Sequence, residues 1–229
     1  MGFFSKLFGK PHPTSVASEI SVAATSQSPA TTTNAVNQLE KAARQLDKHR
    51  MSKMFERAPS FSLIIFAGDC SAAIPELLGA CKYTQRSVTT TRGNLSQLYV
   101  SVEGHSGPNN SIVRKGACVA EGFTILLDPE MLVGTSSNQM GTFCREQETM
   151  ALAVIWERVS ETVMATEYSA TGITRETHYT QGIPDRLTNP HPQILPESDH
   201  RALLAVANDF GLNLGALTDV SMTVYELQE

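Results

Sequence analysis

The pattern of apolar and polar residues predicts a series of strands and helices that begins near residue 60. Ser60–Ala67 is rich in β-branched and aromatic residues and predicts a strand. Ala73–Lys82 predicts a short helix with Pro75 in its first turn. The next segment, Tyr83–Asn94, is polar and rich in threonine, and predicts an irregular connection. A second strand is expected where apolar residues alternate with polar ones, at Leu98, Val100 and Val102.

The central part of the chain predicts two strands and then a long loop. His105–Asn110 has the composition of a turn. Ser111–Asp128 predicts two strands, interrupted near Glu121 and Gly122. Asp128–Phe143 is expected to be a long loop.

The segment that follows has an ambiguous pattern. Met150–Trp156 fits a strand by its alternation, and it also fits a helix that continues toward Val163. Ile183–Pro196 contains four of the eleven prolines and predicts a loop.

The last elements are a helix and a strand. The helix is expected over Asp199–Asp209, with Ser198 as its N-cap and Gly211 at its C-terminal end. The final strand is expected where apolar residues alternate, at Val220, Met222 and Val224. Together the elements predict an α+β fold: a single compact domain over residues 58–229, with a mostly antiparallel sheet and two or three helices, preceded by a disordered N-terminal arm.

Residues 1–13 of that arm predict a basic, amphipathic, membrane-seeking start. In a helix its large apolar side chains fall on one stripe, formed by Phe3, Phe4, Leu7 and Phe8. Lys6 and Lys10 flank the stripe and suit anionic lipid headgroups. Burial of each large apolar side chain contributes at most roughly 1.5–3 kcal/mol, and each lysine about 1 kcal/mol. Such an anchor is weak alone and effective in many copies. The alternative is an arm that packs on its own domain.

Two further segments separate this start from the domain. Residues 14–36 form a linker in which fifteen of 23 residues are Ser, Thr or Ala, so it is expected to be disordered. Residues 37–57 predict a basic amphipathic helix. Its candidate contacts with a nucleocapsid or with lipid are Lys41, Arg44, Lys48 and Lys53. The alternative is a charged face that is merely solvated.

Charge is distributed unevenly along the chain. Residues 1–57 carry eight Lys/Arg against four Asp/Glu, and the remainder carries ten against nineteen, for a total of −5. A basic arm on an acidic body suggests that the arm seeks a surface, whereas the overall balance argues against a dedicated nucleic-acid binder. No run of eighteen apolar residues occurs, and the start lacks a secretory signal, so we expect an intracellular protein with four reduced cysteines.

The sequence holds little that indicates catalysis. It has no phosphate-binding loop, no dinucleotide fingerprint and no zinc motif, so we expect no catalytic residue, no metal and no cofactor. Cys70 follows a predicted strand, where a nucleophile can lie, and an unrecognised thiol enzyme is one alternative. Ser198, Asp199 and His200 resemble part of a catalytic triad, although the serine is already explained as a helix cap.

The order of these features resembles the matrix proteins of rhabdoviruses, especially the vesiculovirus type. The start Ser5–Lys10 is similar to the family's short basic start. The family's opening order of strand, helix and strand is matched by Phe61–Phe66, Ala73–Lys82 and Leu98–Val102. Pro129–Val133 resembles the family's Pro-x-Met-Leu loop, and the resemblance assigns Met150–Trp156 to a strand. Phe210-Gly211-Leu212 is similar to the end of the family's C-terminal helix. The sequence departs from the family in its sparser lysines before the linker and in lacking a PPxY motif.

The resemblance implies a viral matrix protein that binds the inner face of the membrane, self-associates and condenses the ribonucleoprotein during assembly and budding. It implies that Met131, Leu132 and Val133 form an exposed apolar tip that contacts the membrane. The implied partners are a second copy of the chain, an anionic membrane surface, the viral nucleocapsid and the cytoplasmic tail of a viral glycoprotein. The implied location is the virion beneath its envelope, and the host cytoplasm and membranes. A non-viral peripheral-membrane adaptor with a soluble α+β binding domain is the alternative.

Overall fold

The computed structural model describes residues 60–103 and 112–228. The membrane-seeking start, the linker, the basic helix and the turn at His105–Asn110 therefore lie outside the described residues and stay predictions.

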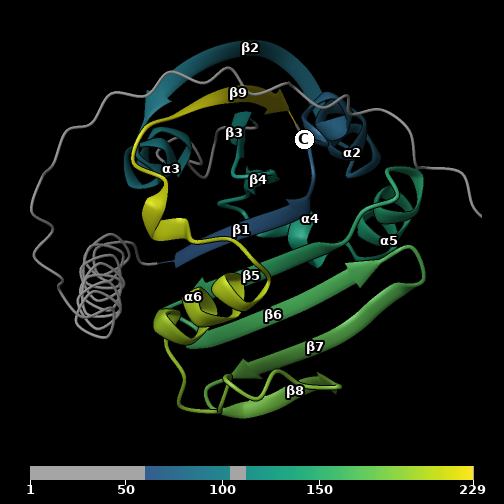
Figure 1. Ribbon diagram of the computed structural model, residues 1–229, viewed down its shortest axis with the longest axis vertical. Helices are drawn as coiled ribbons and strands as arrows, with labels where there is room; N and C mark the ends of the chain where they lie inside the picture. The colour runs from purple at the N-terminus through teal and green to yellow at the C-terminus, as the bar shows by residue number, and fades with distance from the viewer. Residues whose placement is uncertain (1–59, 104–111, 229) are drawn as a thin grey trace, which may run out of the picture. The chain divides into compact units, whose positions relative to one another are not determined.

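The described residues form an α+β fold around one antiparallel sheet of nine strands, which confirms the predicted fold class (Figure 1). The strand order is β2-β9-β3-β4-β1-β5-β6-β7-β8. The strands are β1 (Ser60–Ala67), β2 (Thr84–Gly93), β3 (Ile112–Ala120), β4 (Phe123–Leu127), β5 (Ala151–Glu157), β6 (Thr162–Ser169), β7 (Gly172–Thr180), β8 (Ile183–Thr188) and β9 (Val220–Gln228).

β1 lies at the centre of the sheet, and both of its faces are covered. It pairs with β4 on one side and β5 on the other, and Leu63 lies opposite Leu127 and Val154. Phe61, Leu63 and Ile65 belong to one core, whereas the alternate residues Ile64 and Phe66 belong to a second core on the other face. This explains why the strand is a nearly continuous apolar run.

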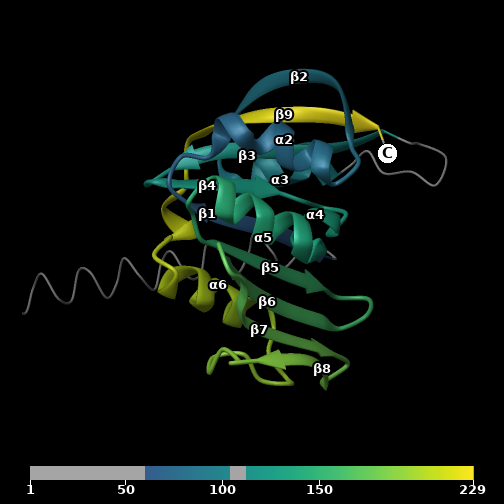
Figure 2. The ribbon, with the colours of Figure 1, turned by 90° about the vertical axis from the view of Figure 1, so that its right-hand side faces the viewer.

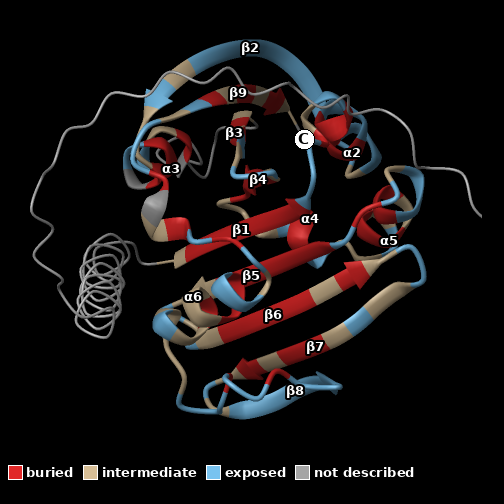
Figure 3. Ribbon diagram, viewed as in Figure 1, coloured by how far each residue is buried: buried red, intermediate tan, exposed pale blue. Residues whose placement is uncertain are grey.

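Helices cover the two faces of the sheet separately (Figure 2). One face is covered by α3 (Leu95–Glu103) and α6 (His200–Asp209), together with the 3-10 helix Leu214–Ala216. The other face is covered by α2 (Ile74–Ala80), α4 (Leu132–Thr135) and α5 (Ser137–Glu146). Burial therefore increases from the edge strands to the centre of the sheet (Figure 3).

Several predicted elements are confirmed. The strands at Ser60–Ala67 and Ser111–Asp128, with a turn at Glu121 and Gly122, are β1, β3 and β4. The short helix with Pro75 in its first turn is α2, and the final strand is β9. The ambiguous segment Met150–Trp156 is a strand, because all of it except Met150 lies in β5.

Four predictions about elements are wrong. The segment expected to be a strand at Leu98–Val102 is the helix α3, and the expected connection Tyr83–Asn94 contains the edge strand β2. The expected loop Asp128–Phe143 contains α4 and most of α5. The expected loop Ile183–Pro196 begins with the edge strand β8.

The start of α6 also differs in one residue from the prediction. The N-cap is Asp199, whose Oδ1 accepts a hydrogen bond from the backbone N–H of Arg201 at 2.9 Å. Ser198 instead accepts a hydrogen bond at Oγ from the N–H of Leu195, at 2.8 Å. The serine therefore closes the preceding turn, and the aspartate begins the helix.

Candidate functional site

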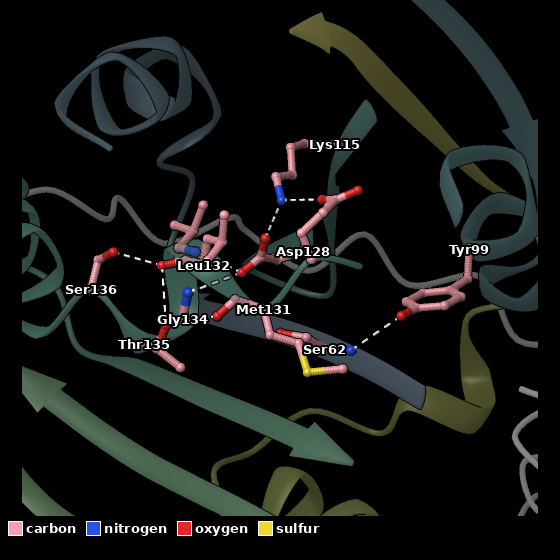
Figure 4. A network of polar contacts seen from close by, with 11 residues as sticks. Ser62, Tyr99, Lys115, Asp128, Met131, Leu132, Gly134, Thr135 and Ser136 are labelled. Carbon is pink, nitrogen blue, oxygen red and sulfur yellow. Dashed lines mark hydrogen bonds and ion pairs between the residues drawn. The ribbon is translucent and has the colours of Figure 1, made fainter. Parts of the chain in front are cut away.

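The turn between β4 and α5, residues 128–136, is the best-defined part of the predicted membrane contact. Asp128 follows β4 and its backbone N–H donates to the carbonyl of Ser62 on β1, at 3.1 Å. Its carboxylate Oδ2 accepts hydrogen bonds from the N–H groups of Val133 and Gly134, at 2.8 and 3.0 Å. One buried carboxylate thus satisfies two backbone donors at the start of α4, and it ties the turn to the sheet (Figure 4).

Lys115 on β3 supplies the opposite charge. Its amino group forms ion pairs with the carboxylate of Asp128 (Figure 4) and with that of Glu130. The side chains of Lys115 and Asp128 are fully buried, and that of Glu130 is 14% exposed. Burial lowers the pKa of Lys115, but the two carboxylates outweigh burial and the pKa is raised above its ordinary value. The lysine is therefore a permanent buried cation.

Tyr83, between α2 and β2, covers this cation. The amino nitrogen of Lys115 lies 5.0 Å from the centre of the Tyr83 ring, in cation–π contact. Burial, with the nearby charge of Asp128 adding to it and that of Lys115 opposing it, raises the pKa of Tyr83 to about 12. The phenol therefore stays neutral at physiological pH.

The tip of the turn differs from the predicted apolar tip. Leu132 is 47% exposed and Met131 is half-buried, but Val133 is fully buried in the core beneath α4. The prediction that Val133 belongs to an exposed tip is therefore wrong. The physical reason is the short helix α4, because successive residues of a helix point in different directions, so that Leu132 is exposed where Val133 is buried in the core.

Backbone geometry and hydroxyl groups hold this tip in one conformation. Met131 has φ = 62°, in the left-handed region that costs energy for a residue with a side chain. The hydroxyl of Thr135 donates to the carbonyl of Met131 at 2.8 Å, and that of Ser136 donates to the carbonyl of Leu132 at 2.6 Å. Tyr168 on β6 donates from its hydroxyl to the carbonyl of Gly134, at 3.0 Å. These hydrogen bonds thus hold the turn in a conformation that exposes the side chain of Leu132.

The other predicted membrane and nucleocapsid residues fall outside the described residues. The membrane set in the arm is Phe3, Phe4, Lys6, Leu7, Phe8 and Lys10, and the nucleocapsid or lipid set is Lys41, Arg44, Lys48 and Lys53.

The residues considered for catalysis have structural partners. Cys70 is buried, and burial raises the pKa of its thiol, which is the opposite of an activated nucleophile. Burial likewise raises the pKa values of Cys118 and Cys144 to about 11. Asp199 caps α6 and pairs with Arg201, and the ring of His200 lies 6.3 Å from that of Trp156.

A second polar cluster lies on the α6 side of the sheet. His191 Nε2 is 3.2 Å from Glu167 Oε1, and Arg175 Nη1 is 3.5 Å from the same oxygen and from His191 Nδ1. Burial and the charge of Arg175 lower the pKa of His191 to about 4, and Asp209 opposes them. Glu167 also favours the protonated ring, but its carboxylate is shared with Arg175. The histidine is therefore neutral at pH 7. In residues 60–103 and 112–228, no three His, Cys, Asp or Glu side chains form a group able to bind a metal.

The ion pairs of Lys115 were missed at the level of sequence, although a signal for them existed. Lys115 lies inside a predicted apolar strand, and Asp128 ends the next one. Pairing the two strands about the turn at Glu121 and Gly122 places Gly116 opposite Leu127, so Lys115 comes beside Asp128. A charge in a buried strand requires a partner, and the register of the two strands identifies Asp128 as the partner of Lys115.

A comparison of the chain with protein-family models, with curated proteins and with solved structures gave no match. The resemblance to rhabdovirus matrix proteins therefore rests on the short motifs quoted above and on the remaining order of features, because Leu98–Val102 is part of the helix α3 and not the second strand of the family's opening order. Among the described helices, none is long and apolar enough to cross a membrane.

Proposed function

We propose that the chain is a viral matrix-type structural protein that binds the inner face of a membrane, self-associates and condenses the ribonucleoprotein beneath the envelope. The observation that carries the proposal is Leu132, an exposed apolar side chain on a turn held by Lys115 and Asp128. It lies where the resemblance places an apolar membrane contact. The proposed partners are a second copy of the chain, an anionic membrane, the viral nucleocapsid and a glycoprotein tail. The proposed location is the virion and the host cytoplasm.

The energetics favour a contact that works only in many copies. One leucine contributes at most about 1.5–3 kcal/mol, and insertion into the interface gives only part of that. The aromatic stripe at Phe3–Phe8 adds further apolar burial, and Lys6 and Lys10 add electrostatic attraction. A weak anchor of this kind becomes effective when self-association links many copies on one surface.

The proposed role is structural, with no reaction. The raised pKa of Cys70 and the engagement of Asp199 with the backbone of α6 support it, because both groups are tied to the fold. For the nucleocapsid, the acidic charge of residues 58–229 opposes direct contact with RNA, so contact through the basic helix at 37–57 or through protein is proposed.

Sedimentation of the full-length protein with anionic vesicles, as a function of protein concentration and salt, tests the proposal. We expect binding that rises cooperatively with concentration and falls with salt. Deletion of residues 1–10 should abolish binding, and Leu132→Gln should weaken it. Val100→Gln is the matched control, because Val100 is 65% exposed on α3 and belongs to no proposed contact. Non-cooperative binding would favour the adaptor, and no binding would refute a membrane role.

A further inference from the structure

The two edges of the nine-stranded sheet differ in how they are protected against pairing with another strand. β8 has six residues, includes Pro184, which has no N–H to donate, and has a register shift in its pairing with β7. β2 has ten residues and no proline. Its one register shift lies between Gln85 and Ser87, which leaves a regular stretch over Ser87–Gly93. Among the described residues, no element pairs with the outer side of β2 (Figures 1 and 3).

The composition of β2 suits pairing with a strand of the same kind. Val88–Thr91 is β-branched throughout, which favours a strand, and β2 contains no carboxylate. Arg92 is neutralised by Asp219, with two hydrogen bonds of 2.8 Å, and Arg86 donates to Gln228 Oε1 at 2.9 Å. Since both arginines already have partners within the chain, the edge does not require an acidic strand.

We propose that β2 pairs antiparallel with β2 of a second copy of the chain, so that the two sheets become one across a two-fold axis. This rests on the proposed function and deepens it, because it names the contact through which copies associate. Pairing through a polar edge strand buries less surface than a stable dimer needs, so the dimer is weak and forms as copies are concentrated on a membrane.

The one apolar side chain of the regular stretch, Val88, selects the register of the pair. A two-fold axis at Thr89 would place Val88 opposite Thr90 of the other copy. An axis at Val88 places the two exposed Val88 side chains opposite each other, so that each covers the other. The proposed axis therefore passes through Val88.

Sedimentation velocity of the full-length protein without membranes tests the contact. We expect a concentration-dependent dimer whose dissociation constant rises about tenfold or more in Val88→Lys, since the new lysines meet at the axis. Leu187→Lys is the matched control on the other edge, because Val88 and Leu187 are both 47% exposed. Circular dichroism verifies that both variants are folded. A monomer at all concentrations, or a dimer that Val88→Lys leaves unchanged, would overturn the proposal.

Oxidative cross-linking tests the register, in a background in which the partly exposed Cys81 is replaced by serine. Val88→Cys should form a disulfide-linked dimer, because the two cysteines lie opposite each other across an antiparallel pair. Thr89→Cys should not, and efficient cross-linking of Thr89→Cys in place of Val88→Cys would overturn the proposed axis. Both experiments are carried out in solution, so their failure is separate from a failure to bind vesicles.

Discussion

Lys115 shows what a single buried charge contributes to the fold. Its amino group is enclosed by two carboxylates and one aromatic ring, and one of these carboxylates also holds the start of α4. Such a group adds less to stability than its strong contacts suggest, because all the charges lose water on burial. Its larger effect is expected on specificity, since Asp128 contacts both the lysine and the backbone of the turn that carries Leu132.

Lys115→Met is expected to lower the free energy of unfolding by about 3–5 kcal/mol, because it leaves Asp128 and Glu130 near each other without a cation. Urea unfolding of the full-length protein measures the change. Lys82→Met, at an exposed position, should stay within about 0.5 kcal/mol of the original protein. The triple variant Lys115→Met, Asp128→Asn, Glu130→Gln should recover part of the loss. If the triple variant lost as much unfolding free energy as Lys115→Met or more, the result would contradict this explanation.

His191 is expected to make the fold sensitive to acid. Its pKa in the folded state is about 4, below the ordinary value of 6.5, so the unfolded chain takes up the proton first as the pH falls. The stabilisation is present above pH 6.5 and is lost as the pH falls through 4, at about 1.4 kcal/mol for each unit of separation. Urea unfolding at a series of pH values should show a shallower decline for His191→Gln. Equal slopes for the two proteins would show that His191 does not titrate in this way.

At the scale of elements, the sequence predicted the interior strands β1, β3, β4 and β9, gave no prediction for β6 and β7, and missed both edge strands. β1, β3, β4 and β9 have apolar patterns because they face cores, whereas β2 is exposed on both faces and has no such pattern. The helix α3 was mistaken for a strand because Val100 falls into an alternation with its neighbours, yet Val100 is the exposed residue. The helical stripe was present in the sequence, at Leu95, Leu98, Tyr99 and Val102, all of them buried.

The candidate site was predictable only in part, because its local structure depends on a contact with another strand. A Met-Leu-Val run indicates apolar character, but which of the three side chains is exposed depends on the four-residue helix α4. That helix begins where it does because Asp128 accepts hydrogen bonds from Val133 and Gly134. Asp128 in turn is positioned by Lys115 on another strand, so a long-range contact decides a local structure that propensity alone does not determine.

The contact between β3 and β9 is expected to be destabilised by a side chain at Gly116. A Cβ atom there would overlap the sulfur of Met222, which is fully buried on the neighbouring strand. Gly116→Ala should therefore cost about 1–3 kcal/mol of unfolding free energy, because the core must repack. Gly79→Ala is the control, since nothing lies within 4 Å of its Cβ position on α2. It should stabilise by about 0.5–1 kcal/mol.

A double variant isolates the clash from other effects of the alanine. Met222→Ala removes the methionine, so Gly116→Ala combined with Met222→Ala should cost less than the sum of the two single changes. Thermal and urea unfolding of the four proteins complete the cycle. Additive costs would place the effect of the alanine elsewhere, for example in the backbone of β3.

At the scale of the whole molecule, the arm and the body have opposite electrostatic effects on an anionic surface. The body at 58–229 is acidic and is repelled, so attraction depends on the lysines of the start. Replacing Lys6 and Lys10 by glutamine should weaken vesicle binding by about 2 kcal/mol, or roughly thirtyfold, at low salt. Near 1 M salt the charges are screened, and the variant and the original protein should bind alike. Leu7→Ser with Phe8→Ser should instead weaken binding at every salt concentration, because apolar burial is not screened. If the glutamine variant stayed weaker at high salt, the lysines would act by a route other than charge.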